Sequence, residues 1–345
     1  MSKTKQFHVA VVGATGAVGQ QMLSILEQRD FPLASLKLLA SARSAGKKVM
    51  FKGNEYTLEE ATPEAFEGVD IALFSAGGSV STKLVPEAIK RGTLCIDNTS
   101  AFRMDPDVPL VVPEVNPDKI FDNNGVIANP NCSTIQMVAA LKPLYDKYGM
   151  DRIVVSTYQA VSGAGAKAIQ ELADQSQAVL NGDEVKKEVL PVGSLPVKHQ
   201  IAFNAIPQID VFLDNGFTNE EMKMIRETKK IYGDESIKVS ATCVRIPVER
   251  GHAESVYVEL KEDFEMADVM ALFANAPGVI VQDKPEEQVY PMPADATGKI
   301  EVFVGRVRRD LDYPKGLHMW VVSDNLLKGA AWNAVQIAEE WIKRQ

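Results

Sequence analysis

The sequence has few cysteines and no long apolar segment. Its 345 residues include three cysteines, at positions 95, 132 and 243, without paired spacing. This spacing does not predict a disulfide framework, and we expect no bound metal. No apolar run approaches the roughly 20 residues that span a bilayer, and the N-terminus leads into a strand without a signal-peptide apolar region. We therefore expect a soluble, cytoplasmic protein with no membrane partner.

Positive charge is also scarce. Lys and Arg total 37 against 46 Asp and Glu, which gives a net charge of -9 and a pI near 5.2. This balance argues against a general affinity for nucleic acid or anionic membranes, so any phosphate site must be local. At 345 residues the chain exceeds the usual size of a single core, which favours two domains with a cleft between them.

The N-terminal third has the pattern of a dinucleotide-binding domain. An apolar strand at residues 7–12 runs into Gly-Ala-Thr-Gly-Ala-Val-Gly at 13–19 and then into a helix around 22–26. Such glycines permit a tight turn and a close approach to the pyrophosphate, which binds at the helix N-terminus. The spacing is not the commoner Gly-x-Gly-x-x-Gly, so the flanking strand and helix carry much of the prediction. Further strands and one helix follow in alternation, at 36–40, 69–74, 84–89 (the helix) and 93–97. This order predicts a Rossmann-type, doubly wound parallel sheet in an α/β fold.

The turn after the second strand favours NADP over NAD. An NAD-preferring site would have an acidic residue there, whereas this chain has Ser41, Ala42, Arg43 and Ser44. An arginine with flanking hydroxyls suits a 2′-phosphate, although a solvated surface arginine is the alternative. The other cofactor contacts are expected in the glycine turn, after a later strand and in more distant turns, namely at Gly13, Ala14, Thr15, Gly16, Ala17, Val18, Ser75, Gly77, Ser162, Gly163 and Asn325.

The rest of the chain is richer in strands. Strands are predicted at 152–158, 238–247, 255–260, 278–282, 301–308 and 316–323, helices at 165–180 and 219–232, and a surface loop at 181–196. This order predicts an α+β domain with a largely antiparallel or mixed sheet. An amphipathic helix over 324–344 closes the chain. We assign residues 1–131, completed by the helix 325–345, to the NADP-binding domain and residues 132–324 to a catalytic domain.

Cys132 stands between a predicted strand and a predicted helix. Residues 126–128 form a short apolar strand, Asn-Pro-Asn breaks it, and Cys132 opens an apolar helical run. Backbone N–H groups and the helix dipole favour the thiolate there, so the sulfur can be a nucleophile near neutral pH. Packing as a small apolar residue is the commoner role of cysteine, and we assign that role to Cys95 and Cys243.

Three polar residues near strand ends could share a site with this cysteine. Gln159 follows a strand and precedes a small-residue turn that allows a nicotinamide to approach closely. Arg245 lies near a strand end, and His252 is expected in the turn just after it. A loop histidine is a natural general acid or base, with an ordinary surface histidine as the alternative.

Six motifs, taken together and in order, resemble the aspartate-semialdehyde dehydrogenase family over essentially the whole chain. They are the glycine turn at 13–19, Ser-Ala-Phe-Arg at 100–103, Asn-Cys-Ser-Thr at 131–134, Gln-Ala-Val-Ser-Gly at 159–163, Glu-Glu-Met-Lys at 220–223, and the segment from Arg-Ile-Pro-Val at 245–248 to Gly-His at 251–252. The resemblance implies NADPH-dependent reduction of L-β-aspartyl phosphate to L-aspartate semialdehyde and phosphate. This reaction serves the biosynthesis of lysine, threonine, methionine and, in bacteria, diaminopimelate. The resemblance also suggests a homodimer, with the catalytic domain serving as the dimerisation domain through its sheet.

The same resemblance implies three catalytic roles. Cys132 would attack the acyl phosphate and form a thioester, which hydride then reduces to the aldehyde. His252 would move protons, first assisting the thiol and later the tetrahedral intermediate. Gln159 would orient the substrate beside the sulfur.

Four charged residues would bind the substrate groups. Arg245 would bind the α-carboxylate and Glu220 the ammonium group, which together select an amino acid. Arg103 and Lys223 would bind the departing phosphate. For Glu220 and Lys223, three apart on a predicted helix, an exposed ion pair of little energetic value is the alternative.

Three other functions remain as alternatives. A glyceraldehyde-3-phosphate dehydrogenase would have Ser-Cys-Thr-Thr-Asn around its cysteine, and an N-acetyl-glutamyl-phosphate reductase typically has Gly-Cys-Tyr-Pro-Thr. An acetylated amine also needs no acidic partner such as Glu220. A non-catalytic NADP-binding relative would lack the cysteine, the glutamine or the histidine, and this chain has all three.

Overall fold

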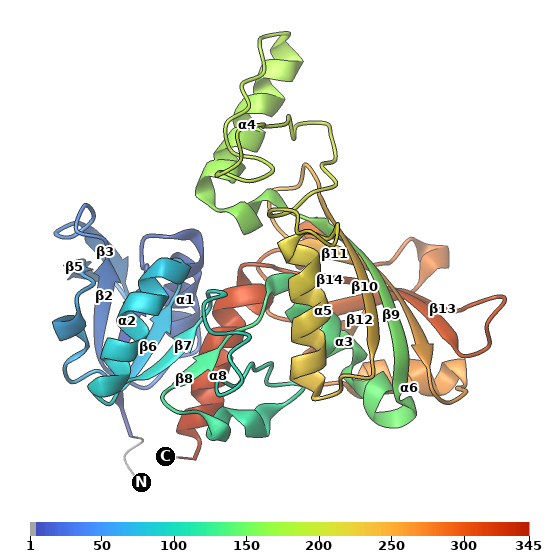
Figure 1. Ribbon diagram of the computed structural model, residues 1–345, viewed down its shortest axis with the longest axis horizontal. Coiled ribbons are helices and arrows are strands. Elements are labelled where there is room, and N and C mark those ends of the chain that lie inside the picture. The colour runs from blue at the N-terminus through green and yellow to red at the C-terminus, as the bar shows by residue number, and fades with distance from the viewer. Residues whose placement is uncertain (1–4, 345) are drawn as a thin grey trace. The chain divides into compact units, whose positions relative to one another are not determined.

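The computed structural model describes residues 5–344 and divides them into two compact units (Figure 1). The first unit contains residues up to Asn131 together with the C-terminal segment from Ala330. The second unit is the continuous segment Cys132–Gly329. Among the described residues, no helix is both long enough and apolar enough to cross a membrane.

The first unit is built on a six-stranded sheet whose pairings are all parallel. The strand order is β5-β2-β1-β6-β7-β8. The strands are β1 (Phe7–Val12), β2 (Leu33–Ala40), β5 (Glu59–Glu60), β6 (Ile71–Phe74), β7 (Leu94–Asp97) and β8 (Val126–Ala128). The central strands β1, β6 and β7 are almost wholly buried, as expected where helices cover both faces of a parallel sheet. The predicted doubly wound sheet is thus confirmed.

The helices of this unit are α1 (Ala17–Gln28), α2 (Gly78–Lys90) and α8 (Trp332–Ile342), with the short η1 (Pro63–Phe66) and η2 (Pro117–Asp122). Helix α8 packs beside α1. A hairpin of β3 (Lys48–Phe51) and β4 (Asn54–Thr57) was not predicted. Its two turn residues, Lys52 and Gly53, both have positive φ, the geometry that a two-residue hairpin turn requires.

The second unit has a mixed six-stranded sheet, as predicted. Its order is β10-β9-β11-β14-β13-β12. The strands are β9 (Met150–Gln159), β10 (Lys238–Arg245), β11 (His252–Leu260), β12 (Val279–Val281), β13 (Val302–Arg309) and β14 (Gly316–Ser323). The pairs β10/β9 and β12/β13 are parallel, and the other pairs are antiparallel.

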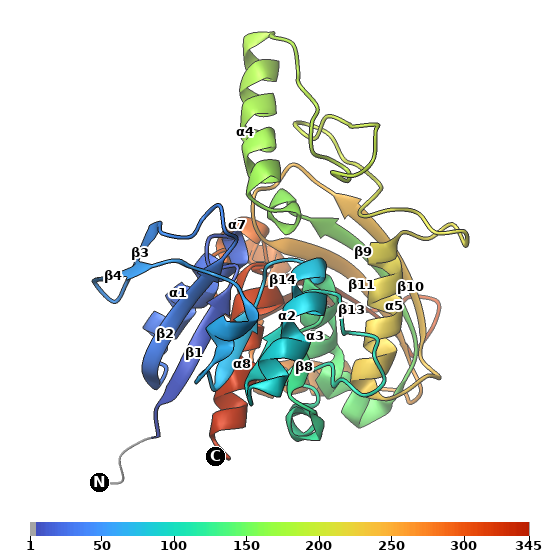
Figure 2. The ribbon, with the colours of Figure 1, turned by 60° about the vertical axis from the view of Figure 1, so that its left-hand side comes forward.

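Three helices of the second unit pack near its sheet. They are α3 (Cys132–Tyr148), α5 (Asn219–Tyr232) and α6 (Met266–Asn275), and α3 contacts β9, β11, β13 and β14. Helix α4 (Ala166–Asn181) instead projects away from the sheet, together with the long loop that follows it (Figures 1 and 2). The short elements of this unit are η3 (Val161–Ala164), η4 (Pro285–Glu287) and α7 (Pro293–Ala296). The π-helical turn η5 (Leu327–Ala331) begins in the second unit and ends in the first.

The predicted closing helix over 324–344 begins later than expected. The Asp324 carboxylate accepts the backbone N–H groups of Leu326 and Leu327 at 2.9 and 3.2 Å. Residue 324 therefore caps the helical segment from outside it, and regular α-helix starts only at Trp332, after the π-helical turn.

Candidate active site

Four neighbouring strands of the second unit bring polar side chains into one row. Gln159 ends β9 and pairs with Arg245, which ends β10. His252 begins β11 and pairs with Ser323, which ends β14. All four side chains are buried. Residues far apart in the sequence thus become neighbours because the register places these four strand termini side by side at one end of the sheet.

His252 lies in a strand, and the prediction that it lies in a turn was wrong. The sequence analysis places the start of this strand at residue 255. In the structure the turn already ends at Gly251, which has a φ of +92°, and the strand starts at His252. The Nδ1 atom of His252 accepts the backbone N–H of Ala160 at 3.0 Å. Burial and the nearby charge of Arg245 lower the pKa of His252 to about 3. The ring is therefore neutral at physiological pH.

The orientation of the Gln159 amide follows from its partners. The Thr157 hydroxyl donates to Oε1 at 2.9 Å, and Nε2 donates to Glu220 Oε1 at 3.1 Å. Because a carboxylate can only accept, the amide nitrogen must face Glu220. The same nitrogen lies 3.5 Å from His252 Nε2.

Arg245 is clamped beside this histidine. Its Nη1 donates to the Ala160 carbonyl at 2.7 Å. The backbone of Ala160 thus binds both side chains, His252 through its N–H and Arg245 through its carbonyl. Burial lowers the pKa of Arg245, while the charges of Glu220 and Cys132 act in the opposite direction. A Cβ added at Gly163 would lie 3.0 Å from Arg245 Nη1 and 3.3 Å from His252 Nε2. The predicted small-residue turn is thus needed for close packing against both side chains.

Glu220 and Lys223 lie in the first turns of α5. Thr218 caps this helix, with Glu221 completing a capping box. Lys223 Nζ lies 3.1 Å from Glu220 Oε2 and 3.0 Å from Asp210 Oδ2. Burial opposes the charge of Lys223, but these two carboxylates raise its pKa above the usual range. Since Glu220 is only 5% exposed, the alternative of an exposed surface pair does not describe this contact.

Cys132 is the first residue of α3, as predicted. It is partly exposed, whereas Cys95 and Cys243 are buried, and burial raises the pKa of both of those thiols. Their predicted packing role agrees with this burial. A Cβ added at Gly329 would lie only 2.7 Å from the Cys132 Cβ, so the chain opposite the cysteine has room for glycine alone.

Asn325 and Ser162 connect two turns of this site. Asn325 Nδ2 donates to Ser162 Oγ at 3.0 Å, and Asn325 Oδ1 accepts the Gly251 N–H at 2.9 Å. These bonds hold η3 beside the residue that precedes His252. Both residues are predicted cofactor contacts, and their positions give them a structural role as well.

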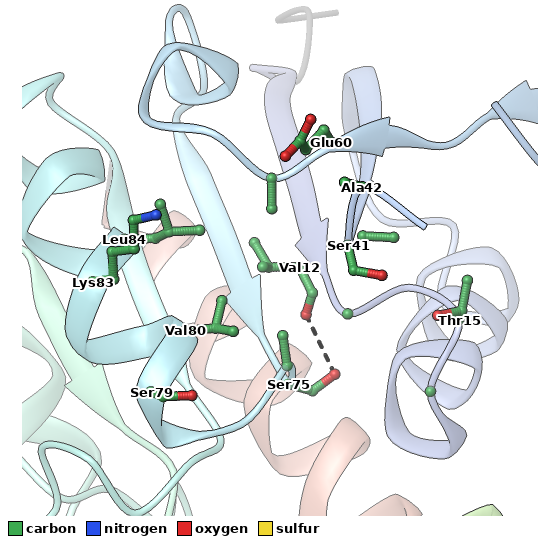
Figure 3. Close-up of a pocket in the computed structure, with 15 residues that line it drawn as sticks. Val12, Thr15, Ser41, Ala42, Glu60, Ser75, Ser79, Val80, Lys83 and Leu84 are labelled. Carbon is green, nitrogen blue, oxygen red and sulfur yellow. Dashed lines mark hydrogen bonds between the residues drawn. The ribbon is translucent and has the colours of Figure 1, made fainter. Parts of the chain in front are cut away.

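The first unit contains a cavity of about 620 Å³ at the carboxyl ends of its parallel strands (Figure 3). Among the predicted cofactor residues, those that line it are Gly13, Thr15, Gly16, Ser41, Ala42 and Ser75. Those of the first unit that do not line it are Ala14, Ala17, Val18, Arg43, Ser44 and Gly77. Sequence reasoning missed Glu60, Ser79 and Lys83, which do. The signal that could have identified Lys83 is a charged residue in the second turn of α2, the helix that follows strand β6.

The unusual glycine spacing of the first turn has a steric reason. Gly13 has a φ of +89°, and a Cβ there would lie 2.9 Å from the Ser75 backbone. A Cβ at Gly19 would lie 2.2 Å from the Gly13 carbonyl oxygen. Gly16 occupies the N-cap of α1. The turn thus leaves backbone N–H groups of a helix N-terminus next to the cavity, where a pyrophosphate can bind.

Comparisons with known proteins agree across both units. Two family models match: "Semialdehyde dehydrogenase, NAD binding domain" at residues 8–123 and "Semialdehyde dehydrogenase, dimerisation domain" at residues 141–328. The aspartate-semialdehyde dehydrogenase of Bacillus subtilis is 64% identical over 96% of both chains. The chain belongs to the aspartate-semialdehyde dehydrogenase family. The family member from Aquifex aeolicus is 57% identical over 98% of both chains.

Solved structures of the aspartate-semialdehyde dehydrogenase family have the same fold. Aspartate semialdehyde dehydrogenase II of Vibrio cholerae, crystallised with ASA, matches with a TM-score of 0.93 and 50% identity over 98% of this chain and 99% of that one. The enzyme of Candida albicans, crystallised with NADP, matches with a TM-score of 0.74 and 26% identity over 97% of this chain and 98% of that one.

Six residues expected from the resemblance to aspartate-semialdehyde dehydrogenases lie in the second unit, namely Cys132, Gln159, Glu220, Lys223, Arg245 and His252. Arg103 belongs to the first unit, where its guanidinium donates to the Asn98 carbonyl at 2.9 Å. Sequence reasoning missed Thr157 and Asp210, which contact Gln159 and Lys223. A threonine on the inward face of a strand is too common a feature to single out.

Proposed function

We propose that the protein uses NADPH to reduce L-β-aspartyl phosphate to L-aspartate semialdehyde and phosphate, and that it catalyses the reverse, phosphorylating oxidation of the aldehyde. The observation that carries this proposal is the buried row of Gln159, Arg245 and His252, with Glu220 bonded to it, in the unit that begins with Cys132. The activity serves amino-acid biosynthesis, as the family membership implies.

Cys132 is the nucleophile of the proposed reaction. Its thiolate attacks the acyl carbon of the substrate, the C–S bond forms, and the C–O bond to phosphate breaks as phosphate leaves with the electron pair. The chemistry that bound NADPH supplies is hydride donation to the acyl carbon of the resulting thioester. The helix N-terminus supports the thiolate both before acylation and after the aldehyde has left.

His252 acts in this proposal as a hydrogen-bond donor. Its Nδ1 already accepts the Ala160 N–H, so the single proton of the neutral ring is on Nε2. Gln159 Nε2 is a second donor only 3.5 Å away. One oxygen atom between them can accept from both, which is the arrangement that stabilises an oxyanion. Because Cys132 enters as a thiolate, neither acylation nor reduction requires His252 to accept a proton, in contrast to the role inferred from the resemblance.

Opposite charges in the site select an amino acid. Arg245 offers a planar donor group to the α-carboxylate, and Glu220 offers a buried acceptor to the ammonium group. Lys223 and Arg103 are proposed to bind the phosphate. The burial of Glu220 favours a free amine over an acetylated one, because a charged ammonium group adds a second ion pair to the carboxylate that Lys223 contacts, whereas an amide nitrogen adds none.

NADP is the proposed cofactor. The glycine turn and the strand ends around the cavity fit a dinucleotide, and Ser41 and Ala42 line it immediately before Arg43 (Figure 3). Glu60 also lines the cavity, and an acidic group there suits a ribose 2′-hydroxyl of NAD. The variants Arg43→Ala and Glu60→Gln separate these possibilities. We expect R43A to weaken NADPH binding much more than NADH binding, and equal losses would contradict the 2′-phosphate role.

The proposed assembly is a homodimer through the second unit. The sheet face that carries Val154 and Tyr158 is exposed, and the Tyr158 ring packs 5.4 Å from that of Trp320. Exposed apolar and aromatic side chains on a sheet are typical of an interface. We expect Val154→Arg to yield monomers in size-exclusion chromatography with light scattering, whereas Leu311→Arg, at a fully exposed position, leaves the dimer intact. A dimeric V154R would contradict this assignment.

The decisive experiment for the activity is phosphate-dependent reduction of NADP and of NAD, followed at the nicotinamide absorbance. Aspartate semialdehyde, N-acetylglutamate semialdehyde and glyceraldehyde 3-phosphate are supplied separately. We expect activity with aspartate semialdehyde and NADP. Activity with another aldehyde instead, or with none, would contradict the proposed function.

A further inference from the structure

A second pair of buried side chains lies next to the active-site row. One is two residues before Gln159 on β9, and the other is two residues after His252 on β11. Thr157 on β9 and Glu254 on β11 face each other in the antiparallel register, and both are fully buried. Because side chains of a strand alternate between faces, they share the face of Gln159 and His252. The reaction as proposed gives Glu254 no part.

One side chain of α3 connects this region to the nucleophile. Gln136 lies one helical turn after Cys132, on the same side of the helix. Its Oε1 accepts the Ser323 hydroxyl at 2.7 Å, and its Nε2 donates to the His252 carbonyl at 3.4 Å. The side chain is fully buried. The helix that begins at the cysteine is therefore bonded to the two strands that carry His252 and Ser323.

Glu254 is the exceptional member of this group. Neither of its oxygens has a partner at full hydrogen-bond geometry within the described chain, although the Gln136 amide is near enough to act on its charge. Burial raises the pKa of Glu254 well above the usual range, and Gln136 offsets this only in part. A buried carboxyl with so little compensation destabilises a protein, so its presence beside Gln136 calls for a function.

We propose that Gln136, supported by Ser323 and Glu254, is a positioning residue that sets the Cys132 helix against the His252 strand. This inference rests on the proposed function, because it concerns the distance between the sulfur and the oxyanion donors. Gln136 fixes that distance through bonds to both strands, and Glu254 contributes a neutral acid that can share the second amide hydrogen of Gln136. Misplacement of reacting groups by about 1 Å can reduce a rate by around 100-fold.

The test compares two variants of the same helix, Gln136→Met and Lys142→Met. The methionine at 136 keeps the length of the glutamine side chain but removes its hydrogen bonds. Lys142 is partly exposed and pairs with Asp146, so it controls for a general change in α3. The wild-type protein and both variants are assayed with aspartate semialdehyde, phosphate and NADP, and the alkylation rate of Cys132 by iodoacetamide is measured in parallel. Ser323→Ala and Ser323→Thr are added as a pair, because only the threonine retains a hydroxyl.

We expect Q136M to lower kcat by about 10- to 100-fold, with little change in either KM or in the alkylation rate, and K142M to resemble the wild type. S323T is expected to recover part of the activity that S323A loses. Unchanged kcat in Q136M would overturn the inference while the proposed function stands. A joint loss of kcat, substrate binding and alkylation would also overturn it, because Gln136 would then support the fold in general. An inactive wild-type protein would instead refute the proposed function, and the inference with it.

Discussion

The buried carboxyl of Glu254 predicts an unusual dependence of stability on pH. In the folded protein burial holds its pKa well above 4.5, the ordinary value, and the group stays protonated. In the unfolded chain it ionises as the pH rises through 4.5. Unfolding above that pH therefore releases one proton, and stability falls by about 1.4 kcal/mol per pH unit until the pH reaches the folded-state pKa. From pH 4.5 to 7.5 the loss is at most about 4 kcal/mol.

The variant Glu254→Gln removes this titration and retains the size of the side chain. A buried amide has its own cost, but that cost does not change with pH. We therefore expect the difference in unfolding free energy between E254Q and the wild type to shift steadily in favour of E254Q as the pH rises from 4.5. Urea denaturation, followed by circular dichroism at several pH values, measures this difference.

The matched control is Glu259→Gln, a half-exposed carboxyl on the same strand that pairs with Arg152 at 3.3 Å. The variant E259Q controls for the general effect of replacing a glutamate with a glutamine on β11. If the E254Q difference were constant across the pH range, Glu254 would titrate alike in the folded and unfolded states. That result would refute the reasoning from burial.

Three further predictions concern the active site. Cys132→Ala should abolish turnover while NADP binding, measured by fluorescence titration, stays intact, and substantial residual activity would contradict the thioester route. Gly329→Ala should lower kcat by about 10-fold or more, because its Cβ would lie 2.7 Å from that of Cys132. Gly193→Ala, where a Cβ meets open space, is the control and should have no effect on kcat. Equal rates in the two variants would argue against this contact. Since the pKa of His252 is lowered to about 3, the ring stays neutral down to that value, and His252→Gln should leave the acidic side of the kcat profile between pH 5 and 7 unchanged in shape. A wild-type acidic limb near the ordinary histidine pKa that disappears in the variant would show that His252 does become protonated.

Local signals predict individual elements well in this chain. The helix predicted at 219–232 has those limits in the structure, because Thr218 and Glu221 form a capping box and Gly233 ends the helix in the left-handed conformation. The start of α3 at Cys132 follows likewise from the break before it. In contrast, the sequence around His252 contains polar and glycine residues typical of a turn, and the pairing of β11 with β14 extends the strand to that histidine.

The arrangement of the site is harder to predict because strand register creates it. Nothing in the sequence shows that Gln159 pairs with Arg245, or that His252 pairs with Ser323. The sequence reasoning named three of these four, first as polar residues near strand ends and then through the resemblance, and it missed Ser323. Gln136 carries a weak signal, since it is a polar residue in an apolar helical run, but such a residue is more often a feature of a solvated face.

The Ala160 residue that bonds to both His252 and Arg245 has a consequence for mutagenesis. Both contacts are made by main-chain atoms, the N–H to Nδ1 and the carbonyl to Nη1. Only proline lacks the N–H, and it fits the φ of -63° at this position, so Ala160→Pro removes the bond to His252, whereas every other substitution reports only steric tolerance. Replacing the amide N–H with an ester oxygen, by chemical synthesis or semisynthesis, removes the same donor without the proline ring, and either change would free the imidazole to exchange its tautomers.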